Sequence, residues 1–323
     1  MRLLITGITG FVGGHMAEYA LAQGATVWGS RRASSQTAQL ERLGGRIVLL
    51  ESDLRDAPAV RALLEEAAPD AIVHLAAQSS VRASWEAPAE TLTNNVVSQV
   101  NLLEAVRALG LEPRILVVGT SEEYGLAYPD EIPIGEHNPL RPLSPYALSK
   151  VSQDLMGYQY FEVYGLPIVR SRAFNHEGPG RSDAFMTGSF ARQIAEIEAG
   201  RREPVILVGD LEPRRDYSDV RDIVRGYWLL LTRGTPGEVY NLCSGRSWAI
   251  RTVLDFLLER AHVRGIEVRT DPARLRPTEM PLIEGDPAKV KRALGWQVEI
   301  PFERTLADVL DYWRAQIRAN GAR

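Results

Sequence analysis

The first half of the chain alternates short apolar runs with longer amphipathic stretches. The apolar runs predict strands, which we place at 2–6, 25–30, 46–52, 71–77 and 114–120. The stretches between and after them predict helices, which we place at 13–24, 58–67, 91–110 and 145–164. Strands that alternate with helices are typical of a parallel, doubly wound sheet. The sequence therefore predicts an α/β protein.

The regular alternation ends after the apolar segment 166–174. Gly, Pro, Arg and Asp are frequent over 175–183 and 209–222, whereas 238–245 predicts a late strand of the same sheet. We therefore expect a smaller C-terminal lobe that binds substrate, because small-molecule sites usually lie in clefts between lobes. The expected division places 1–172 and about 218–245 in the sheet domain, and about 173–217 and 246–323 in the lobe.

Composition narrows the class of protein. The 323 residues carry a net charge of −4 with no large basic block, which argues against nucleic-acid binding. The single cysteine, Cys243, excludes an internal disulfide and any site with several cysteine ligands, so no metal site is expected. No apolar run reaches the length of a membrane span, and a glycine follows the opening apolar run too early for a signal peptide. We expect a cytoplasmic protein with no membrane partner.

A glycine-rich turn follows the first predicted strand. Gly7, Gly10 and Gly13 lie between that strand and the first helix, in the spacing GxxGxxG. Glycines allow a tight turn and close approach of the backbone to a diphosphate, and a helix N-terminus presents free N–H groups to an anion. A glycine triplet alone is often only a turn. Its place between strand and helix in a repeating β/α pattern favours dinucleotide binding.

The end of the second strand bears on cofactor choice. It contains Arg31 and Arg32 and no carboxylate that could bind an adenosine 2′-hydroxyl, whereas arginine suits a 2′-phosphate. NADP(H) is therefore preferred, and NAD(H) stays possible because both arginines could be ordinary surface residues. Asp53 and Leu54, after the third strand, are placed to meet the adenine edge, although Asp53 could equally cap a helix.

Tyr146 and Lys150 are four residues apart near the start of a predicted helix, which places them on one face. A lysine ammonium nearby is expected to lower the pKa of the tyrosine toward a value useful for proton transfer. The pair alone is weak, because both residue types are common on helix surfaces. Thr120 strengthens it, since this hydroxyl lies at the carboxyl end of a strand, where ligand crevices form.

The motifs GITGFVG, HLAAQSSV, TSEEYG and SPYALSK follow one another in this order. Together they resemble the extended short-chain dehydrogenases/reductases that act on nucleotide sugars, over essentially the whole chain. The resemblance implies a Rossmann-type fold, a catalytic set of Thr120, Tyr146 and Lys150, and a supporting role for Asn95 beside the fourth strand. The cofactor site it implies comprises Gly7, Thr9, Gly10, Phe11, Val12, Gly13, Arg31, Arg32, Asp53, Leu54, Leu75, Ala76, Ala77, Tyr146 and Lys150.

Segments of the second half, at 171–181, 208–222 and 275–296, are similar to the branch that acts on GDP-mannose derivatives. The partner implied is a GDP-sugar, with Asn175 near the sugar, Arg215 and Arg276 on the diphosphate, and Glu279 on the guanosine ribose. A structural salt bridge is the alternative role for either arginine. The resemblance also implies a homodimer through helices 91–110 and 145–164, whose apolar positions could instead be buried within one chain.

This branch contains both a GDP-mannose 4,6-dehydratase and a reductase of the 4-keto sugar. Glu122 occupies the place of the elimination base of the dehydratase and therefore favours that reaction. The turn GITGFVG, the loop EGPGRSD and the short segment RRASSQTAQ favour the reductase. We expect NAD(P)H-dependent reduction of the C4 keto group of GDP-4-keto-6-deoxy-D-mannose to GDP-D-rhamnose. The alternatives are 4,6-dehydration of GDP-mannose, another nucleotide-sugar epimerase or dehydratase, and a non-catalytic cofactor-binding module.

Overall fold

The fold is built on a parallel sheet. The computed structural model describes residues 1–275 and 280–319. Within these residues seven strands form one sheet in the order β10-β6-β5-β4-β1-β2-β3, and every neighbouring pair is parallel. The strands are β1 (Arg2–Thr6), β2 (Thr26–Arg31), β3 (Ile47–Glu51), β4 (Ala71–His74), β5 (Arg114–Thr120), β6 (Ile168–Ala173) and β10 (Val239–Leu242). The predicted α/β, doubly wound fold is confirmed.

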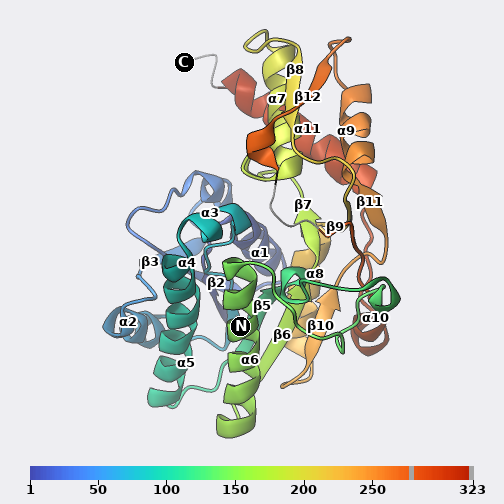
Figure 1. Cartoon of the computed structure of the whole chain (residues 1–323). Helices are drawn as coiled ribbons and strands as arrows, with labels where there is room; N and C mark the ends of the chain where they lie inside the picture. The colour runs from blue at the N-terminus through green and yellow to red at the C-terminus, as the bar shows by residue number, and fades with distance from the viewer. Residues whose placement is uncertain (276–279, 320–323) are drawn as a thin grey trace.

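Helices cover both faces of this sheet (Figure 1). One face is covered by α1 (Phe11–Ala22) and α8 (Val220–Arg233), which share an apolar core with the strands. The other face is covered by α2 (Ala57–Ala67), α5 (Ser98–Ala108) and α6 (Pro145–Tyr164). Because parallel strands all point the same way, their carboxyl ends meet at one edge, and the loops there can form a single site.

The start of α6 is fixed by its own sequence. The Ser144 side chain accepts a hydrogen bond from the Ala147 amide at 3.0 Å, and Pro145 occupies the first helical position. The helix ends at Gly165, which has a φ of 70° that few other residues adopt. Tyr146 and Lys150 are therefore held in the first turns of a well-capped helix, at the carboxyl edge of the sheet.

Three predicted elements differ in the structure. The strand predicted at 238–245 is β10, which ends at Leu242, three residues early. β4 ends at His74, three residues before the predicted end, because the chain leaves the sheet to meet the glycine turn and the Ala76 amide donates to the Thr6 hydroxyl at 3.3 Å. The predicted helix 91–110 is α4 (Pro88–Leu92), a π-helical turn over 93–97 and α5. The π turn carries Asn95, whose side-chain amide donates to Ser149 at 2.8 Å and to the Gln78 carbonyl at 3.1 Å.

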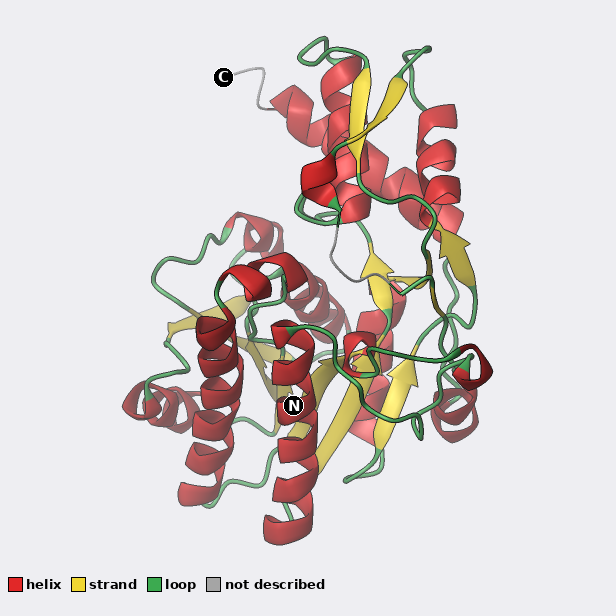
Figure 2. Ribbon diagram, in the orientation of Figure 1, coloured by secondary structure: helices red, strands yellow, loops and turns green. Residues whose placement is uncertain are grey.

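A second group of elements lies beyond the carboxyl edge of the sheet, at the top of Figures 1 and 2. Its apolar core joins α7 (Met186–Glu198), β8 (Val205–Val208), α9 (Ile250–Glu259) and α11 (Phe302–Ala319), with β12 (Glu267–Thr270) paired to β8. A separate small sheet pairs β9 (Arg214–Asp219) with β7 (Asn175–Glu177), β11 (Ser247–Ala249) and β13 (Leu282–Ile283). The remaining helices are α3 (Val81–Glu86) and α10 (Ala288–Leu294).

The exact division into domains stays a prediction, and packing supports one change to it. Val290 and Leu294 of α10, with Trp296, belong to the apolar core of the main sheet rather than to that of the second lobe. The Trp296 ring nitrogen donates to the Asp222 carbonyl at 3.0 Å, on α8. We therefore propose that 288–296 fold with the sheet domain, although the sequence pattern placed them in the lobe.

Candidate active site

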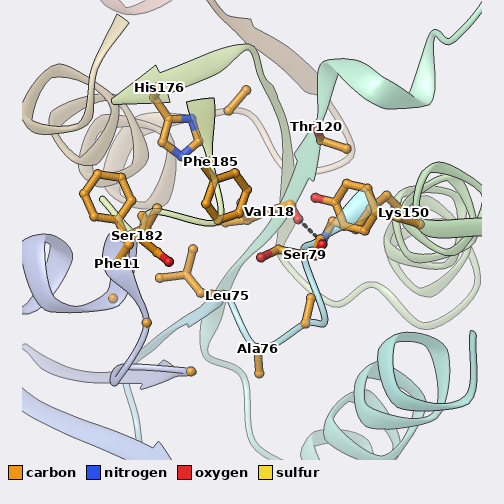
Figure 3. A pocket seen from close by; sticks show the side chains of 18 of the residues that line it. Phe11, Leu75, Ala76, Ser79, Val118, Thr120, Lys150, His176, Ser182 and Phe185 are labelled. Carbon is orange, nitrogen blue, oxygen red and sulfur yellow. Dashed lines mark hydrogen bonds between the residues drawn. The ribbon is translucent and has the colours of Figure 1, made fainter. Parts of the chain in front are cut away.

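A cleft of about 590 Å³ opens at the carboxyl ends of β1, β4 and β5 (Figure 3). It brings together every predicted cofactor and catalytic residue, as well as Asn175 and Arg215 from the segments after β6. Arg276 and Glu279 lie outside the described residues. The structure thus gathers residues from ten or more separate stretches of the chain along one cavity, while the individual roles assigned to them remain predictions.

The glycine turn has the shape that a diphosphate requires. Gly7 has a φ of 71°, and a Cβ there would lie 2.9 Å from the Ala76 amide nitrogen. A Cβ at Gly13 would lie 2.5 Å from the Gly7 carbonyl oxygen, so neither position accepts a side chain. Gly10 precedes α1 and no side chain caps that helix, which leaves its first N–H groups directed at the cleft. These residues fit the diphosphate of a dinucleotide.

The predicted adenosine end of the cleft is polar. Arg31 and Arg32 line it, together with three residues that the sequence did not single out, Ser30, Ser35 and Gln39. The Arg31 guanidinium lies 3.2 Å from the Glu51 carboxylate at the end of β3, whereas Arg32 is exposed. Arginine and serine donors together suit a phosphate group, and Glu51 would compete with it for Arg31.

Asp53 lies in the cleft wall but does not cap a helix. Its carboxylate pairs with Arg55 at 2.6 Å, and hydrogen bonds from Arg55 lower the pKa of Asp53 to about 2. The residue that caps α2 is Asp56, whose side chain accepts from the Ala59 amide. The alternative role considered for Asp53, a helix N-cap, is therefore wrong.

The pKa of Tyr146 is raised, whereas the sequence predicted that Lys150 would lower it. Tyr146 is buried, and burial together with the Glu122 carboxylate raises the pKa of its phenol, while the nearby Thr120 hydroxyl opposes the shift. The expected net lowering by Lys150 is not found, because the Lys150 ammonium donates instead to the Val118 carbonyl at 2.6 Å and to the Gln153 side chain at 2.8 Å. Tyr146 therefore keeps its proton at neutral pH and is suited to donate it.

Lys150 is connected to a buried polar chain that the sequence did not reveal. Gln153 accepts from Lys150, and its amide nitrogen lies 3.3 Å from His74 Nε2. His74 Nδ1 lies 2.9 Å from the Thr6 hydroxyl at the glycine turn. Burial and the Lys150 charge lower the pKa of His74 to about 3, so the ring is neutral. The chain links the start of α6 to the ends of β1 and β4.

Glu122 projects into the cleft from a short 3-10 turn, Ser121–Glu123, that directly follows β5. Its side chain is half-buried, and its charge acts on Tyr146. The Thr120 hydroxyl accepts a hydrogen bond from the Glu122 amide at 3.3 Å. The threonine hydroxyl, the tyrosine and the carboxylate thus lie near one another, and a proton donor and a candidate base are both available.

The far wall of the cleft comes from the segments after β6. Arg215, on β9, is buried, and its guanidinium donates to the Met280 carbonyl at 2.7 Å. Arg181 was not singled out from the sequence. It lies 3.1 Å from the buried Glu177 carboxylate, with its guanidinium 3.6 Å from the Phe185 ring centroid. Asn175 opens β7 beside them.

His176 lines the cleft without a sign of metal binding. Its Nδ1 lies 2.9 Å from the Phe174 carbonyl, and burial lowers the pKa of the ring to about 4. Residues 1–275 and 280–319 contain no cluster of three or more His, Cys, Asp or Glu side chains arranged to hold a metal ion. In the same ranges, no helix is long and apolar enough to cross a membrane.

Comparison with known proteins agrees with this geometry. The family model for GDP-mannose 4,6 dehydratase matches residues 4–309. The chain is 36% identical to GDP-6-deoxy-D-mannose reductase of Pseudomonas aeruginosa over 98% of both chains. It is 34% identical to GDP-mannose 4,6-dehydratase of Sinorhizobium fredii over 92% of both.

Solved structures show the same fold. RMD from Pseudomonas aeruginosa complexed with NADPH superimposes with a TM-score of 0.84 and 32% identity, covering 98% of this chain and all of that one. A UDP-glucose 4-epimerase from Thermus thermophilus in complex with NAD gives a TM-score of 0.86 and 30% identity, covering 97% and 99%. Fold, cleft and sequence agree, and the chain belongs to the GDP-mannose 4,6-dehydratase family of extended short-chain dehydrogenases/reductases.

Proposed function

We propose that the protein is an NAD(P)H-dependent reductase that converts the C4 keto group of GDP-4-keto-6-deoxy-D-mannose to the alcohol of GDP-D-rhamnose. The observation that carries this proposal is the cleft itself, in which a protonated Tyr146, the Thr120 hydroxyl and Lys150 lie beside a dinucleotide-type glycine turn. A ketone reduction needs a proton donor and a hydrogen-bond donor to the same oxygen, and these residues provide both.

The reductase aligns with fewer gaps than the dehydratases do. The Sinorhizobium fredii dehydratase aligns over 325 positions that include only 92% of this chain, against 98% for the reductase. The Pseudomonas reductase aligns over 318 positions, close to the 323 residues of this chain. The Yersinia enterocolitica dehydratase aligns over 365 positions, so it carries segments that this chain lacks. The connection after β2, where 15 residues join Arg31 to Ile47, contains the short segment whose resemblance favours the reductase. Identity alone does not separate the two, since it is 36% and 33%.

The proposed roles follow from position and charge. A bound dihydronicotinamide would supply the hydride that reduces the ketone. Tyr146 donates its proton to the carbonyl oxygen as negative charge develops there, and Thr120 donates a hydrogen bond to the same oxygen. Lys150 holds positive charge at the base of the cleft and favours the phenolate that Tyr146 becomes. The GDP-sugar would be bound by Asn175 and Arg215. Arg276 and Glu279, which lie beyond the described residues, would also bind it.

NADPH is the proposed cofactor. The Pseudomonas structure is complexed with NADPH, whereas the Thermus epimerase is complexed with NAD, so relatives of both kinds exist. The pair Arg31 and Arg32, with Ser30 and Ser35, supports a 2′-phosphate in this chain. The competing ion pair of Arg31 with Glu51 would weaken that preference without abolishing it.

Dehydration of GDP-mannose is the second candidate, and Glu122 is the observation that favours it. A carboxylate facing the cleft near Tyr146 could remove a proton from the carbon next to a C4 ketone. In the reductase this carboxylate has a simpler effect, since its charge keeps the Tyr146 phenol protonated until the ketone accepts the proton. The same residue thus has a role under either reaction.

We also propose a homodimer formed through α6. This helix exposes four large apolar residues to solvent, with exposed fractions between 45% and 62%. They are Leu148, Leu155, Tyr158 and Val163. In contrast, α5 buries Leu102, Leu103 and Val106 fully within the chain. The structure therefore gives less support to α5 than to α6 as part of the expected interface. Exposed apolar side chains gathered on one helix favour burial against a second copy.

The product test separates the two reactions. Incubated with GDP-4-keto-6-deoxymannose and NADPH, the protein should form GDP-D-rhamnose, whereas GDP-mannose with NADP⁺ should stay unchanged; NMR of the sugars identifies both. Glu122→Gln should retain reduction within about fivefold, while a dehydratase would lose about 100-fold or more with its base removed. Formation of the 4-keto sugar from GDP-mannose would contradict the reductase proposal.

Tyr146→Phe should lower kcat for ketone reduction by about 100-fold to 10,000-fold, because the proton donor is lost. Dissociation constants for the GDP-sugar and NADPH, measured by calorimetry, should change little. Tyr160→Phe is the matched control, since this tyrosine is on the same helix but its hydroxyl bonds Glu104, away from the cleft. Near wild-type turnover by Tyr146→Phe would show that another group donates the proton.

Replacing Arg31 and Arg32 together with alanine should raise KM for NADPH by about 10-fold or more and leave KM for NADH almost unchanged, because charge-assisted bonds to the 2′-phosphate are lost. Glu51→Gln is the control. It frees Arg31 from its ion pair and should keep or strengthen the preference for NADPH. An unchanged NADPH/NADH ratio in the double variant would mean that this strand end does not select the cofactor.

Sedimentation velocity tests the dimer. The protein should sediment as a dimer at micromolar concentration, and Leu148→Glu with Leu155→Glu should sediment as a monomer because two charges would be buried at the contact. Leu275→Glu, an exposed position in the second lobe, should remain dimeric. A monomeric wild-type protein would rule out the interface.

A further inference from the structure

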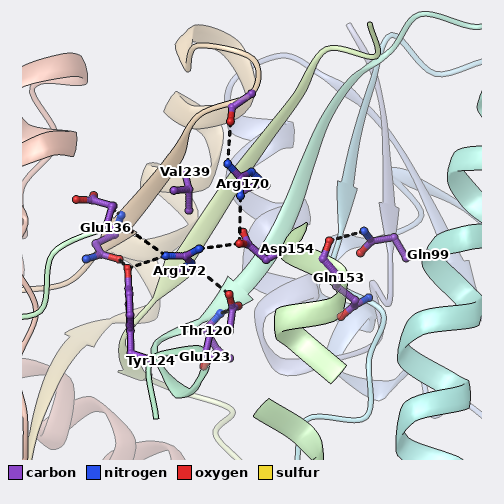
Figure 4. Close-up of polar contacts among 12 residues, drawn as sticks. Gln99, Thr120, Glu123, Tyr124, Glu136, Gln153, Asp154, Arg170, Arg172 and Val239 are labelled. Atoms are coloured by element: carbon purple, nitrogen blue, oxygen red, sulfur yellow. Dashed lines mark hydrogen bonds and ion pairs between the residues drawn. The ribbon is translucent and has the colours of Figure 1, made fainter. Parts of the chain in front are cut away.

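A cluster of four charged side chains is buried directly behind Thr120, away from the cleft (Figure 4). Arg172, on β6, lies 3.2 Å from the Glu123 carboxylate and 2.7 Å from the Asp154 carboxylate of α6. Arg170 lies 3.1 Å from the same Asp154 oxygen. No side chain of the four is more than 8% exposed. Buried charges are costly unless paired, so this arrangement needs a reason.

Glu123 connects the cluster to the candidate catalytic threonine. Its second oxygen, Oε1, accepts a hydrogen bond from the Thr120 amide at 2.8 Å, while the Thr120 hydroxyl accepts from the Glu122 amide at 3.3 Å. These reciprocal bonds form a capping box around the turn after β5. Since the Thr120 oxygen already accepts from the backbone, its own proton is left to be donated into the cleft.

The backbone of β5 is shaped to admit this carboxylate. A Cβ at Gly119 would collide with Glu123 Oε1, so only glycine leaves room for Glu123 to reach the Thr120 amide. On the other side of Gly119, the Val118 carbonyl accepts from the Lys150 ammonium at 2.6 Å. Glu123 and Lys150 thus hold the two peptide groups that flank Gly119, and both fix the direction in which Thr120 leaves the strand.

The charges that face these groups come from several elements. Lys150 is faced by the carboxylates of Glu123 and Asp154, which favour its charged form, and by the neutral ring of His74. Tyr146 is faced by Glu122, Glu123 and Arg181. Glu123 itself is faced by Arg172, Asp154 and Lys150, and both of its oxygens accept from N–H groups, which is the bonding pattern of an ionised carboxylate.

Burial and the two carboxylates have opposite effects on Lys150. Burial lowers the pKa of the Lys150 ammonium, and Glu123 and Asp154 oppose that decrease. Burial and Asp154 raise the pKa of Glu123, and Arg172 opposes that increase. Removal of the Glu123 charge would therefore let Lys150 lose its proton at lower pH. It would also lower the pKa of Tyr146, because Glu123 contributes to raising it.

We propose that Glu123 is a positioning residue, whose carboxylate orients Thr120 through its backbone amide and whose negative charge lies across Gly119 from the Lys150 ammonium. The proposal rests on the reductase function for the roles of Thr120 and Lys150. It separates Glu123 from its neighbour Glu122, which faces the cleft. The two roles of Glu123 depend on different properties, namely the reach of the side chain and its charge, and they can be tested by different substitutions.

Glu123→Asp keeps the charge and shortens the side chain by one methylene, so the bond to the Thr120 amide is lost. It should lower kcat for reduction by about 100-fold, with KM for NADPH and the pH profile unchanged. Glu123→Gln keeps an oxygen acceptor for Thr120 and removes the charge. It should retain kcat at low pH, while the alkaline limb of kcat/KM moves to lower pH by about one unit.

Asp154→Asn is the matched control. It removes one buried carboxylate from the same cluster and from the surroundings of Lys150, but it does not touch Thr120. It should move the alkaline limb of the kcat/KM profile to lower pH, as Glu123→Gln does. It should leave kcat at low pH close to wild type. If either Glu123 variant does not fold, Glu123→Gln combined with Arg172→Met removes one charge of each sign, and the same limb shift is expected of it.

A second measurement is independent of activity. Hydrogen exchange of the peptide around Thr120, followed by mass spectrometry, should be faster in Glu123→Asp than in wild type or Asp154→Asn, because the Thr120 amide loses its acceptor. Unchanged exchange and unchanged kcat in Glu123→Asp, or a wild-type pH profile in Glu123→Gln or its double variant, would overturn the proposal. Failure of the wild-type protein to reduce the keto sugar would instead overturn the proposed function, and the exchange result would still decide whether Glu123 orients Thr120.

Discussion

The pairing of buried charges at the carboxyl end of β5 is the constraint on which the candidate site depends. Thr120 has to leave the sheet in one direction, beside a lysine that is itself buried. The Glu123 carboxylate holds the Thr120 amide, and the Lys150 ammonium holds the Val118 carbonyl two residues earlier. Arg172 and Asp154 complete the pairing behind the strand. Burial lowers the pKa of Lys150, and the carboxylates of Glu123 and Asp154 oppose that decrease.

The rest of the fold delivers other groups to the same edge. Because all seven strands are parallel, the glycine turn after β1, the polar end of β2 and the threonine of β5 face one cleft. The second lobe closes the far side with Arg181 and Arg215, both held by contacts of their own. Glu51 at the end of β3 modifies the cofactor end of this cleft by pairing with Arg31. Under the proposed roles, cofactor and sugar would be recognised by residues from different lobes.

Local patterns in the sequence were sufficient for the main sheet and for the glycine turn. Apolar runs and glycine spacing reflect the local conformation of the chain, so β1, β2, β3 and β5 lie within about a residue of their predicted places. The predicted end of β4 was wrong because the Ala76 amide bonds the Thr6 hydroxyl, a contact between distant segments. The π turn at Asn95 was not predicted for the same reason, since its stabilising partners are the distant Gln78 and Ser149.

The chemistry was predictable only in part. Tyr146 and Lys150 were found from their helical spacing, but the predicted direction of the tyrosine pKa shift was wrong, because burial and Glu122 raise the pKa of Tyr146 while Lys150 donates to Val118 and Gln153 instead. Glu123 was visible within TSEEYG, yet its partners Arg172 and Asp154 come from a later strand and helix. No local pattern marks such a cluster. The connection of Gln153 and His74 to Lys150 was hidden for the same reason.

In the proposed reaction a hydride passes from NADPH to C4 of a keto sugar. The most direct test uses NADPH deuterated at the transferable position, with GDP-4-keto-6-deoxymannose as substrate. One deuterium should appear at C4 of the product for each cofactor oxidised, and none at C5 or C6. A product without deuterium at C4, or sugar turnover without net oxidation of the cofactor, would contradict the proposed reaction.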